Sequence, residues 1–133
     1  MFNIIANLSS YKGKIINDHL KALSYVSQNN YLINHLNVKE NLEVFKINYK
    51  VLNRFGLKDK EDFNVNNLSM GEKARLSLIL GLYSDSELIL IDEPITNLDK
   101  KNAIKVVKEI FKASINKIIL VISHEKELFK NKV

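Results

Sequence analysis

Two short, uninterrupted apolar runs, separated by a segment with helical periodicity, constrain the fold of this chain most strongly. Residues 88–91 and 118–122 contain only leucine, isoleucine and valine. Such runs are typical of strands covered on both faces in a parallel sheet. Between them, four apolar residues share one face of a helix: Ile104, Val107, Ile110 and Phe111. Asp99 can cap this helix, so the order strand, helix, strand predicts a parallel crossover unit of an α/β fold.

A second helix is predicted over residues 69–83. One face of this segment is apolar and carries Leu76, Ile79, Leu80 and Tyr83. Ser69 and Glu72 form the S-x-x-E pattern of a capping box, which fixes where the helix begins. The capping box and the apolar face together make this the best-defined helix of the chain.

The first half of the chain contains weaker signals. Residues 2–8 resemble the end of a helix, and short strands are predicted over residues 14–16 and 23–26. The apolar residues of segment 38–55 fall at mixed spacings that favour one or two helices over a strand. Since no repeat or proline- and glycine-rich linker separates these segments, we expect one domain.

The composition limits the classes of function. A chain of 133 residues, 46% of them hydrophobic, is long enough for one compact core. It has no cysteine, which excludes disulfides and thiolate metal sites. The net charge of +5 comes from dispersed lysines rather than one basic block, so direct binding of nucleic acid is not expected. No uncharged apolar run reaches the roughly 18 residues that span a bilayer.

Polar side chains follow both apolar strands. Asp92 and Glu93 come directly after the first, and Ser123 and His124 after the second. In open α/β sheets the functional crevice lies outside the carboxyl ends of the strands. One of two adjacent carboxylates can hold a hydrated Mg²⁺ while its neighbour accepts a proton from an attacking water. A solvated strand end would also account for Asp92 and Glu93, so both interpretations stay open.

Five segments, in the same order along the chain, resemble motifs of the ATP-binding cassette (ABC) family. Residues 68–75, LSMGEKAR, are similar to the signature motif LSGGQ followed by a basic residue and an arginine. Residues 88–94 resemble the Walker B segment with its catalytic glutamate, and residues 97–99 resemble the D-loop. Residues 123–124 look like the switch histidine, and residues 25–28 look like the Q-loop.

The resemblance implies an α/β P-loop NTPase (RecA-like) ABC ATPase fold, incomplete at its N-terminus, in which a parallel sheet carries a short helical subdomain. Residues 1–133 would form a single partial ABC ATPase domain. Within it, residues 1–28 and 84–133 would form the RecA-like part, and residues 29–83 the helical subdomain with the signature motif.

The resemblance also implies that ATP and Mg²⁺ are the cofactors. Gln28 would contact the Mg²⁺ and the attacking water, and Asp92 would bind the metal through water. Glu93 would be the general base, and His124 would contact the γ-phosphate.

The signature residues would contact a nucleotide held by a second cassette, since family members pair head to tail. In this arrangement Ser69 and Gly71 would contact its γ-phosphate, and Asp99 would lie across the dimer interface. A helix N-terminus offers unpaired N–H groups and a positive dipole end to an anion, which agrees with this role. Met70 and Glu72 belong to the same nucleotide-contacting set but replace a glycine and a glutamine of the commonest signature.

The phosphate-binding loop of the family, G-x-x-x-x-G-K-S/T, is not found in this sequence, because none of its four glycines begins such a pattern. Residues 2–8 resemble the helix that follows this loop in the family, so Met1 would fall just after the missing loop. The backbone N–H groups and lysine of the loop neutralise the triphosphate. We therefore expect the chain alone to bind Mg-ATP weakly or not at all and not to hydrolyse it. Without the strand that precedes the loop, it should also aggregate or need a partner.

Three functions remain open. The first is the ATPase subunit of an ABC transporter, held at the cytoplasmic face of the membrane by a transmembrane permease; residues 37–42 resemble the transporter cassettes and favour it. The second is a non-catalytic partner, or a truncated remnant, that lends Ser69 and Gly71 to another cassette. The third is a fragment of an ABC-type translation factor, to which GEKARL is also similar. Nothing in the sequence identifies a transported substrate.

Overall fold

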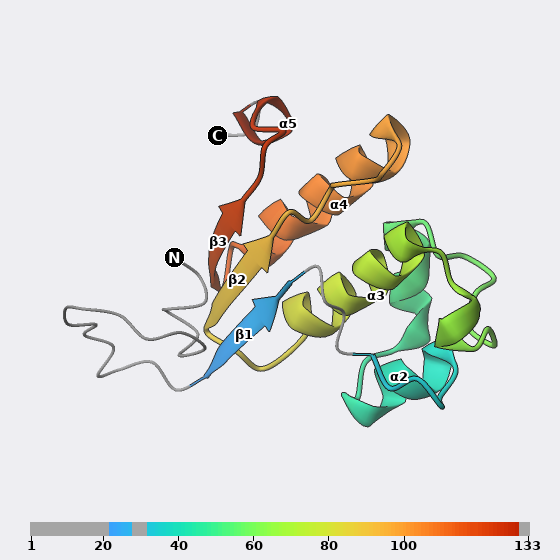
Figure 1. Ribbon diagram of the computed structural model, residues 1–133. Helices are drawn as coiled ribbons and strands as arrows, with labels where there is room; N and C mark the ends of the chain where they lie inside the picture. Colours follow the sequence, from blue (N-terminus) through green and yellow to red (C-terminus); the bar gives the residue numbers. More distant parts are fainter. Residues whose placement is uncertain (1–21, 28–31, 131–133) are drawn as a thin grey trace, which may run out of the picture.

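The structure is a computed structural model that describes residues 22–27 and 32–130. A parallel sheet of three strands lies on one side of the molecule (Figure 1). The strands are β1 (Leu23–Val26), β2 (Leu88–Asp92) and β3 (Ile118–Ile122), in the order β1-β2-β3. This arrangement confirms the predicted α/β class with a parallel sheet. The predicted helix over residues 2–8 and strand over residues 14–16 lie outside the described residues.

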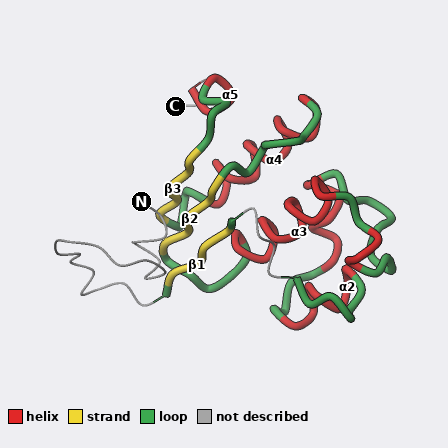
Figure 2. The backbone as a smooth tube through the Cα atoms, in the orientation of Figure 1, coloured by secondary structure: helices red, strands yellow, loops and turns green. Residues whose placement is uncertain are grey.

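Helical segments follow β1 and β2 along the chain. Those after β1 are α2 (Val38–Val44), the 3-10 helices η1 (Tyr49–Phe55) and η2 (Val65–Asn67), and α3 (Met70–Leu82). The helix α4 (Lys100–Ala113) connects β2 to β3, and the short α5 (Glu127–Lys130) follows β3. The tube in Figure 2 shows the first group gathered beside β1. Among the described residues, no helix is long and apolar enough to cross a membrane.

Side-chain caps explain where several helices begin. Asn37 and Glu40 form a capping box at the start of α2, and the side chain of Asn48 accepts a hydrogen bond from Lys50 N–H at the start of η1. The predicted one or two helices over residues 38–55 are therefore one α-helix and one 3-10 helix. At the start of α4, Asp99 accepts a hydrogen bond from Asn102 N–H, as predicted.

Two details differ from the prediction. Ile104, assigned to the apolar face of α4, is 38% exposed; the buried apolar residues of this helix are Ala103, Val106, Val107 and Ile110. In β3, expected to be covered on both faces, Ile118 and Leu120 are 63% and 40% exposed. Ile118 and Leu120 alternate along β3 and therefore lie on the same face of the sheet, which is only partly covered at this strand.

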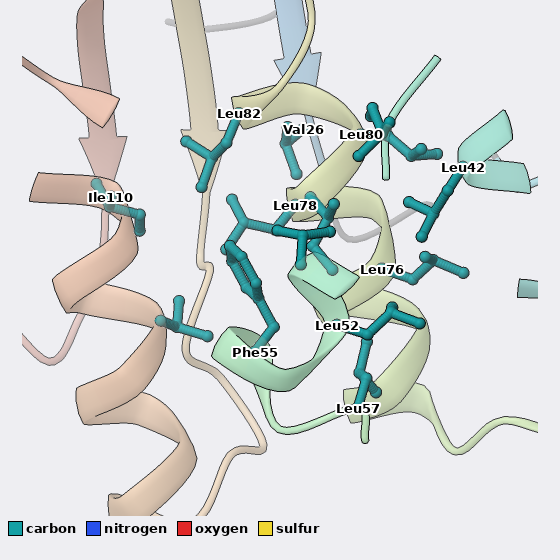
Figure 3. Close-up of a cluster of buried hydrophobic side chains, with 14 of the residues drawn as sticks. Val26, Leu42, Leu52, Phe55, Leu57, Leu76, Leu78, Leu80, Leu82 and Ile110 are labelled. Carbon is teal, nitrogen blue, oxygen red and sulfur yellow. The ribbon is translucent and has the colours of Figure 1, made fainter. Parts of the chain in front are cut away.

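One hydrophobic cluster joins the sheet to both groups of helices. Figure 3 shows Val26 of β1, Leu78 of α3, Phe55 of η1 and Ile110 of α4 as members of this cluster. The second half of α3 is buried around most of its circumference, since residues 78–82 are all buried. Packing on several sides therefore fixes the position of α3 relative to the sheet.

Gly81 allows α3 to lie very close to β1. A Cβ atom added to this glycine would overlap with Cγ2 of Val26. Since valine is β-branched and its χ1 is restricted, the side chain of Val26 cannot easily turn away. Gly81 therefore sets how closely α3 approaches the sheet whose carboxyl end carries the candidate site.

Candidate active site

The carboxyl ends of β2 and β3 bring together the polar residues that follow these strands. Asp92 is the last residue of β2 and pairs in register with Ile122, the last residue of β3. The N–H of Glu93 donates to the carbonyl of Ile122 at 2.9 Å, which continues the pairing by one residue. Glu93 and His124 therefore lie next to one another, at the edge of the sheet where the sequence places them.

The side chain of Glu93 is held by several contacts. Its carboxylate accepts hydrogen bonds from the backbone N–H of His124, at 3.1 and 3.4 Å, and from the hydroxyl of Thr96, at 2.9 Å. Nε2 of His124 lies 3.4 Å from Oε1 of Glu93, and the imidazole is 95% exposed whereas the Glu93 side chain is only 9% exposed. Glu93 itself has a positive φ of 53°. The carboxylate is therefore aimed at the end of β3, and the imidazole beside it is open to a ligand.

Asp92 is held by a residue from the neighbouring strand. The hydroxyl of Tyr25 in β1 donates to Oδ2 of Asp92 at 3.4 Å. Among the described residues, no group of three or more histidine, aspartate or glutamate side chains is placed to bind a metal ion. A single carboxylate such as that of Asp92 is a suitable oxygen ligand for a hydrated Mg²⁺, in which water and phosphate oxygens complete the coordination. Gln28, the other predicted metal contact, lies outside the described residues.

The N-terminus of α3 is closed by the predicted capping box. Ser69 N–H donates to Oε2 of Glu72 at 2.8 Å, and Glu72 N–H donates to Oγ of Ser69 at 3.2 Å. Oε1 of Glu72 also lies 3.2 Å from Nζ of Lys60. Both carboxylate oxygens of Glu72 therefore have partners within the chain, whereas the neighbouring Met70 is 77% exposed.

These contacts determine the charge state of Glu72. Burial alone would raise the pKa of its carboxyl, but the hydrogen bonds from Ser69 and the ammonium of Lys60 outweigh burial and lower the pKa. The carboxylate is therefore stabilised in its charged form, and its negative charge interacts favourably with the positive end of the α3 dipole.

The loop between β2 and α4 packs against the N-terminal turn of α3. Asn97 has a positive φ of 65°. A Cβ atom on Gly71 would lie 3.3 Å from Cδ2 of Leu98 and 3.5 Å from the carbonyl oxygen of Asn97, so glycine permits this close approach. Asp99, at the end of the loop, caps α4, and the hydrogen bonds from the backbone and side chain of Asn102 lower the pKa of its carboxyl. Gly71 and the predicted D-loop residues thus form one packed junction.

A small hollow lies between the N-terminus of α3 and the carboxyl end of β2. It has a volume of about 60 Å³ and is lined from α3 by Met70 and Gly71, and from the strand end and its loop by Asp92, Glu93 and Asn97. Ligand pockets commonly measure about 300–1,000 Å³. A nucleotide at this edge of the sheet would therefore need surface beyond this hollow.

Three residues of this region were not singled out as functional in the sequence. Tyr25, interpreted as a packing residue, contacts Asp92 across the sheet. Thr96 contacts Glu93, and a hydroxyl three residues after a glutamate in a predicted loop is the signal that indicates such a contact. Arg75 is buried at the junction of α3 with the loop, with only 7% of its surface exposed. An arginine on a predicted buried helix gives a signal for this position.

Known proteins resemble this chain in sequence and in structure. The family model described as "ABC transporter" matches residues 1–96, more than half of the chain. A putative hemin import ATP-binding protein, HrtA, of Staphylococcus haemolyticus is 30% identical over 84% of this chain and 57% of its own length. An ergothioneine transport ATP-binding protein, EgtV, of Helicobacter pylori is 33% identical over 81% of this chain and 58% of its own length. The chain thus spans little more than half the length of these two relatives.

Solved structures support the fold. An RNase-L inhibitor structure overlays on 95% of this chain with a TM-score of 0.80 at 24% identity, and 26% of that protein is covered. A dimeric structure of the ATP-binding cassette MJ0796 with ADP and Pi overlays on 80% of this chain with a TM-score of 0.69 at 24% identity, and 53% of that protein is covered. At these identities the structures show the α/β P-loop NTPase fold alone. The family match, the relatives and the fold agree that this chain belongs to the ABC transporter family.

Proposed function

We propose that this chain is part of the nucleotide-binding ATPase subunit of an ABC transporter and couples ATP binding and hydrolysis to transport. The observation that carries the proposal is the contact of Glu93 with His124 at the carboxyl ends of β2 and β3. A carboxylate beside an exposed imidazole, next to a second carboxylate on Asp92, provides a base, a phosphate contact and a metal ligand at one edge of the sheet. The relatives HrtA and EgtV are themselves named as import and transport ATP-binding proteins.

In this proposal each residue has one role. Asp92 holds the hydrated Mg²⁺, with Gln28 as a further contact, and Tyr25 orients the Asp92 carboxylate. Bound Mg²⁺ neutralises charge on the phosphate oxygens. Glu93 accepts a proton from the attacking water, and His124 contacts the γ-phosphate. The hydrogen bonds from His124 N–H and the Thr96 hydroxyl hold the Glu93 carboxylate beside His124, which supports these roles.

We further propose that a second cassette completes the site. Ser69, Met70, Gly71 and Glu72 at the N-terminus of α3, with Asp99 nearby, would face the nucleotide of that partner. The exposed Met70 and the helix N-terminus are compatible with this role, as is the dimer seen in the MJ0796 structure. A transmembrane permease would hold the pair at the cytoplasmic face of the membrane. The names of the relatives mention different substrates, hemin and ergothioneine, and therefore select none for this chain.

The 133 residues alone should not form a working ATPase. The sequence contains no phosphate-binding loop whose backbone N–H groups and lysine would neutralise a triphosphate. We expect no hydrolysis and at most weak binding of Mg-ATP by the isolated chain. Saturable binding at micromolar ATP, measured by calorimetry, would contradict this expectation.

Cell fractionation tests the transporter proposal against a translation factor. The translation factor has one specific observation in its favour. A structure of a complex that contains the archaeal ribosome recycling factor aABCE1 overlays on 96% of this chain with a TM-score of 0.80, although at 24% identity this shows the fold alone. An antibody to the peptide that carries LSMGEKAR would follow the native polypeptide. The transporter proposal predicts that it sediments with membranes and is released when the permease is extracted with detergent. Sedimentation with ribosomes would contradict the proposal and favour the translation factor.

A mixing experiment tests the second function, a non-catalytic partner that lends its signature residues. The purified chain would be added to an intact cassette whose own signature serine has been replaced. If Ser69 and Gly71 are lent, ATP hydrolysis returns on mixing and is lost with Ser69→Arg. Ser114→Arg is the matched control, because Ser114 is exposed and ends α4, whereas Asp99, near the signature residues, caps the opposite end of this helix. The intact mass of the native polypeptide separates the first function from this one: a mass well above 15.3 kDa, with a phosphate-loop peptide upstream, favours a complete ATPase subunit.

A further inference from the structure

Arg75 is a buried cation that the proposed function does not use. It lies in the second turn of α3 and has 7% of its surface exposed. Its Nε atom is buried and has no hydrogen-bond partner among the described residues. A guanidinium has five N–H donors, and leaving a buried donor unpaired costs about 1–3 kcal/mol. A buried arginine of this kind therefore calls for an explanation in terms of the elements around it.

The surroundings of Arg75 are the junction between α3 and the loop before α4. Nη1 of Arg75 lies 3.7 Å from the point where a Cβ on Gly71 would be. The carbonyl oxygen of Asn97 and Cδ2 of Leu98 lie 3.5 and 3.3 Å from the same point. Gly71 is thus close to the guanidinium of Arg75, to the main chain of the loop and to the side chain of Leu98.

The charges around Arg75 are arranged on both sides of this junction. Glu72 belongs to α3 and Asp99 ends the loop, and both carboxylates interact favourably with the guanidinium. Burial lowers the pKa of Arg75, and these two acids oppose that effect. The guanidinium thus interacts electrostatically with one acid of the helix and one acid of the loop.

We infer that Arg75 is a positioning residue that holds the loop of residues 97–99 against the N-terminal turn of α3, so that the two move as one unit. The arginine interacts electrostatically with both carboxylates, and its guanidinium lies beside Gly71. This inference goes beyond the proposed function and does not rest on it, since it concerns contacts within one chain. For an ATPase it would mean that the signature residues and Asp99 cannot change position independently.

Two measurements on the complete polypeptide test the inference without any nucleotide. The first is the hydrogen exchange of Leu98 N–H, which donates to the carbonyl of Ile95 at 3.2 Å and so reports opening of the loop. The second is the pKa of Asp99, followed by NMR of its carboxyl carbon. Arg75→Met removes the charge but keeps an apolar stem of similar length. We expect at least tenfold faster exchange of Leu98 and a higher pKa of Asp99, with little change in the melting temperature, because a poorly paired buried charge has been replaced by an apolar group.

Controls separate positioning from mere packing. Arg75→Lys keeps the charge, so exchange of Leu98 should stay within about threefold of the parent and the pKa of Asp99 should stay low. Lys73→Met removes a charge from the same helix, two residues away, and should change neither quantity. If Arg75→Met does not fold, Arg75→Gln replaces it with the same expected changes. Unchanged exchange and pKa in the neutral variants, or equal changes in Arg75→Lys, would overturn the inference.

Discussion

Gly81→Ala should reveal how closely α3 is packed on the sheet. Gly81 is the last residue but one of α3. Alanine is more favourable than glycine by up to about 1 kcal/mol within a helix, so helix propensity alone predicts no loss of stability. The structure predicts the opposite, because the new methyl group would overlap with Cγ2 of Val26 in β1. Overpacking of this kind typically costs about 1–3 kcal/mol. We therefore expect Gly81→Ala to lower the free energy of unfolding by about 1 kcal/mol.

A double-mutant cycle with Val26→Ala gives the sharper result. Val26→Ala alone removes two methyl groups from a side chain that is 9% exposed. At about 0.8 kcal/mol for each group, it should cost roughly 1.6 kcal/mol, and somewhat more if a cavity remains. In the double variant the methyl group of alanine 81 has no Cγ2 to meet and fills part of the space. The double variant should therefore be more stable than the sum of the single effects by about 1–3 kcal/mol.

Urea unfolding of the four proteins, followed by circular dichroism, measures this coupling. The complete polypeptide is the material, and the slopes of the transitions should agree before free energies are compared. If the two effects add within about 0.5 kcal/mol, or if Gly81→Ala is stabilising, the close approach of α3 to β1 is not what the structure describes.

Two further predictions concern the N-terminus of α3. Ser69→Ala removes one half of the capping box and should lower the free energy of unfolding by about 1 kcal/mol, whereas Ser69→Thr should keep most of the stability of the parent. Urea unfolding measures all three proteins, and equal stability would contradict the capping role. Because the folded state lowers the pKa of Glu72 from its ordinary value of 4.5, this group stabilises the protein above pH 4.5, and the contribution is lost as the pH falls through the folded-state pKa. Glu72→Gln should therefore be less stable than the parent at pH 7 and lose less stability on acidification; parallel pH profiles of the two proteins would refute the assignment.

The sequence predicted those parts of the fold that depend on a few neighbouring residues. The strand at residues 88–91, the capping box of Ser69 and Glu72 and the cap at Asp99 all follow from a few adjacent residues. The contact of Tyr25 with Asp92 joins residues 67 positions apart and depends on the register of β1 on β2, which a single sequence does not specify. The exposure of Leu120 likewise depends on what covers its face of β3, which a single sequence does not specify.

The candidate site could likewise be predicted only in part. The adjacent acids and the histidine that follows the next strand could be placed at one edge of the sheet, because parallel strands end together. The direction of the Glu93 carboxylate could not, because it depends on positive φ angles at Glu93 and Asn97 and on the Thr96 hydroxyl. The packing of Arg75 near the loop before α4 could not be predicted either, because it depends on the loop folding back onto Gly71.

The most direct test of the proposed function is the ATPase activity of the native polypeptide that carries LSMGEKAR, purified through a tag together with its bound partners. Glu93→Gln should lower the rate of hydrolysis at least about 100-fold while ATP still binds, because a general base typically contributes 10²–10⁴-fold. Asp85→Asn is the matched control, since Asp85 is exposed at the opposite end of β2 and should leave the rate unchanged. Retained hydrolysis in Glu93→Gln, or no hydrolysis by the parent complex, would contradict the proposal that the carboxylates at this edge of the sheet form the metal and base half of an ATP site.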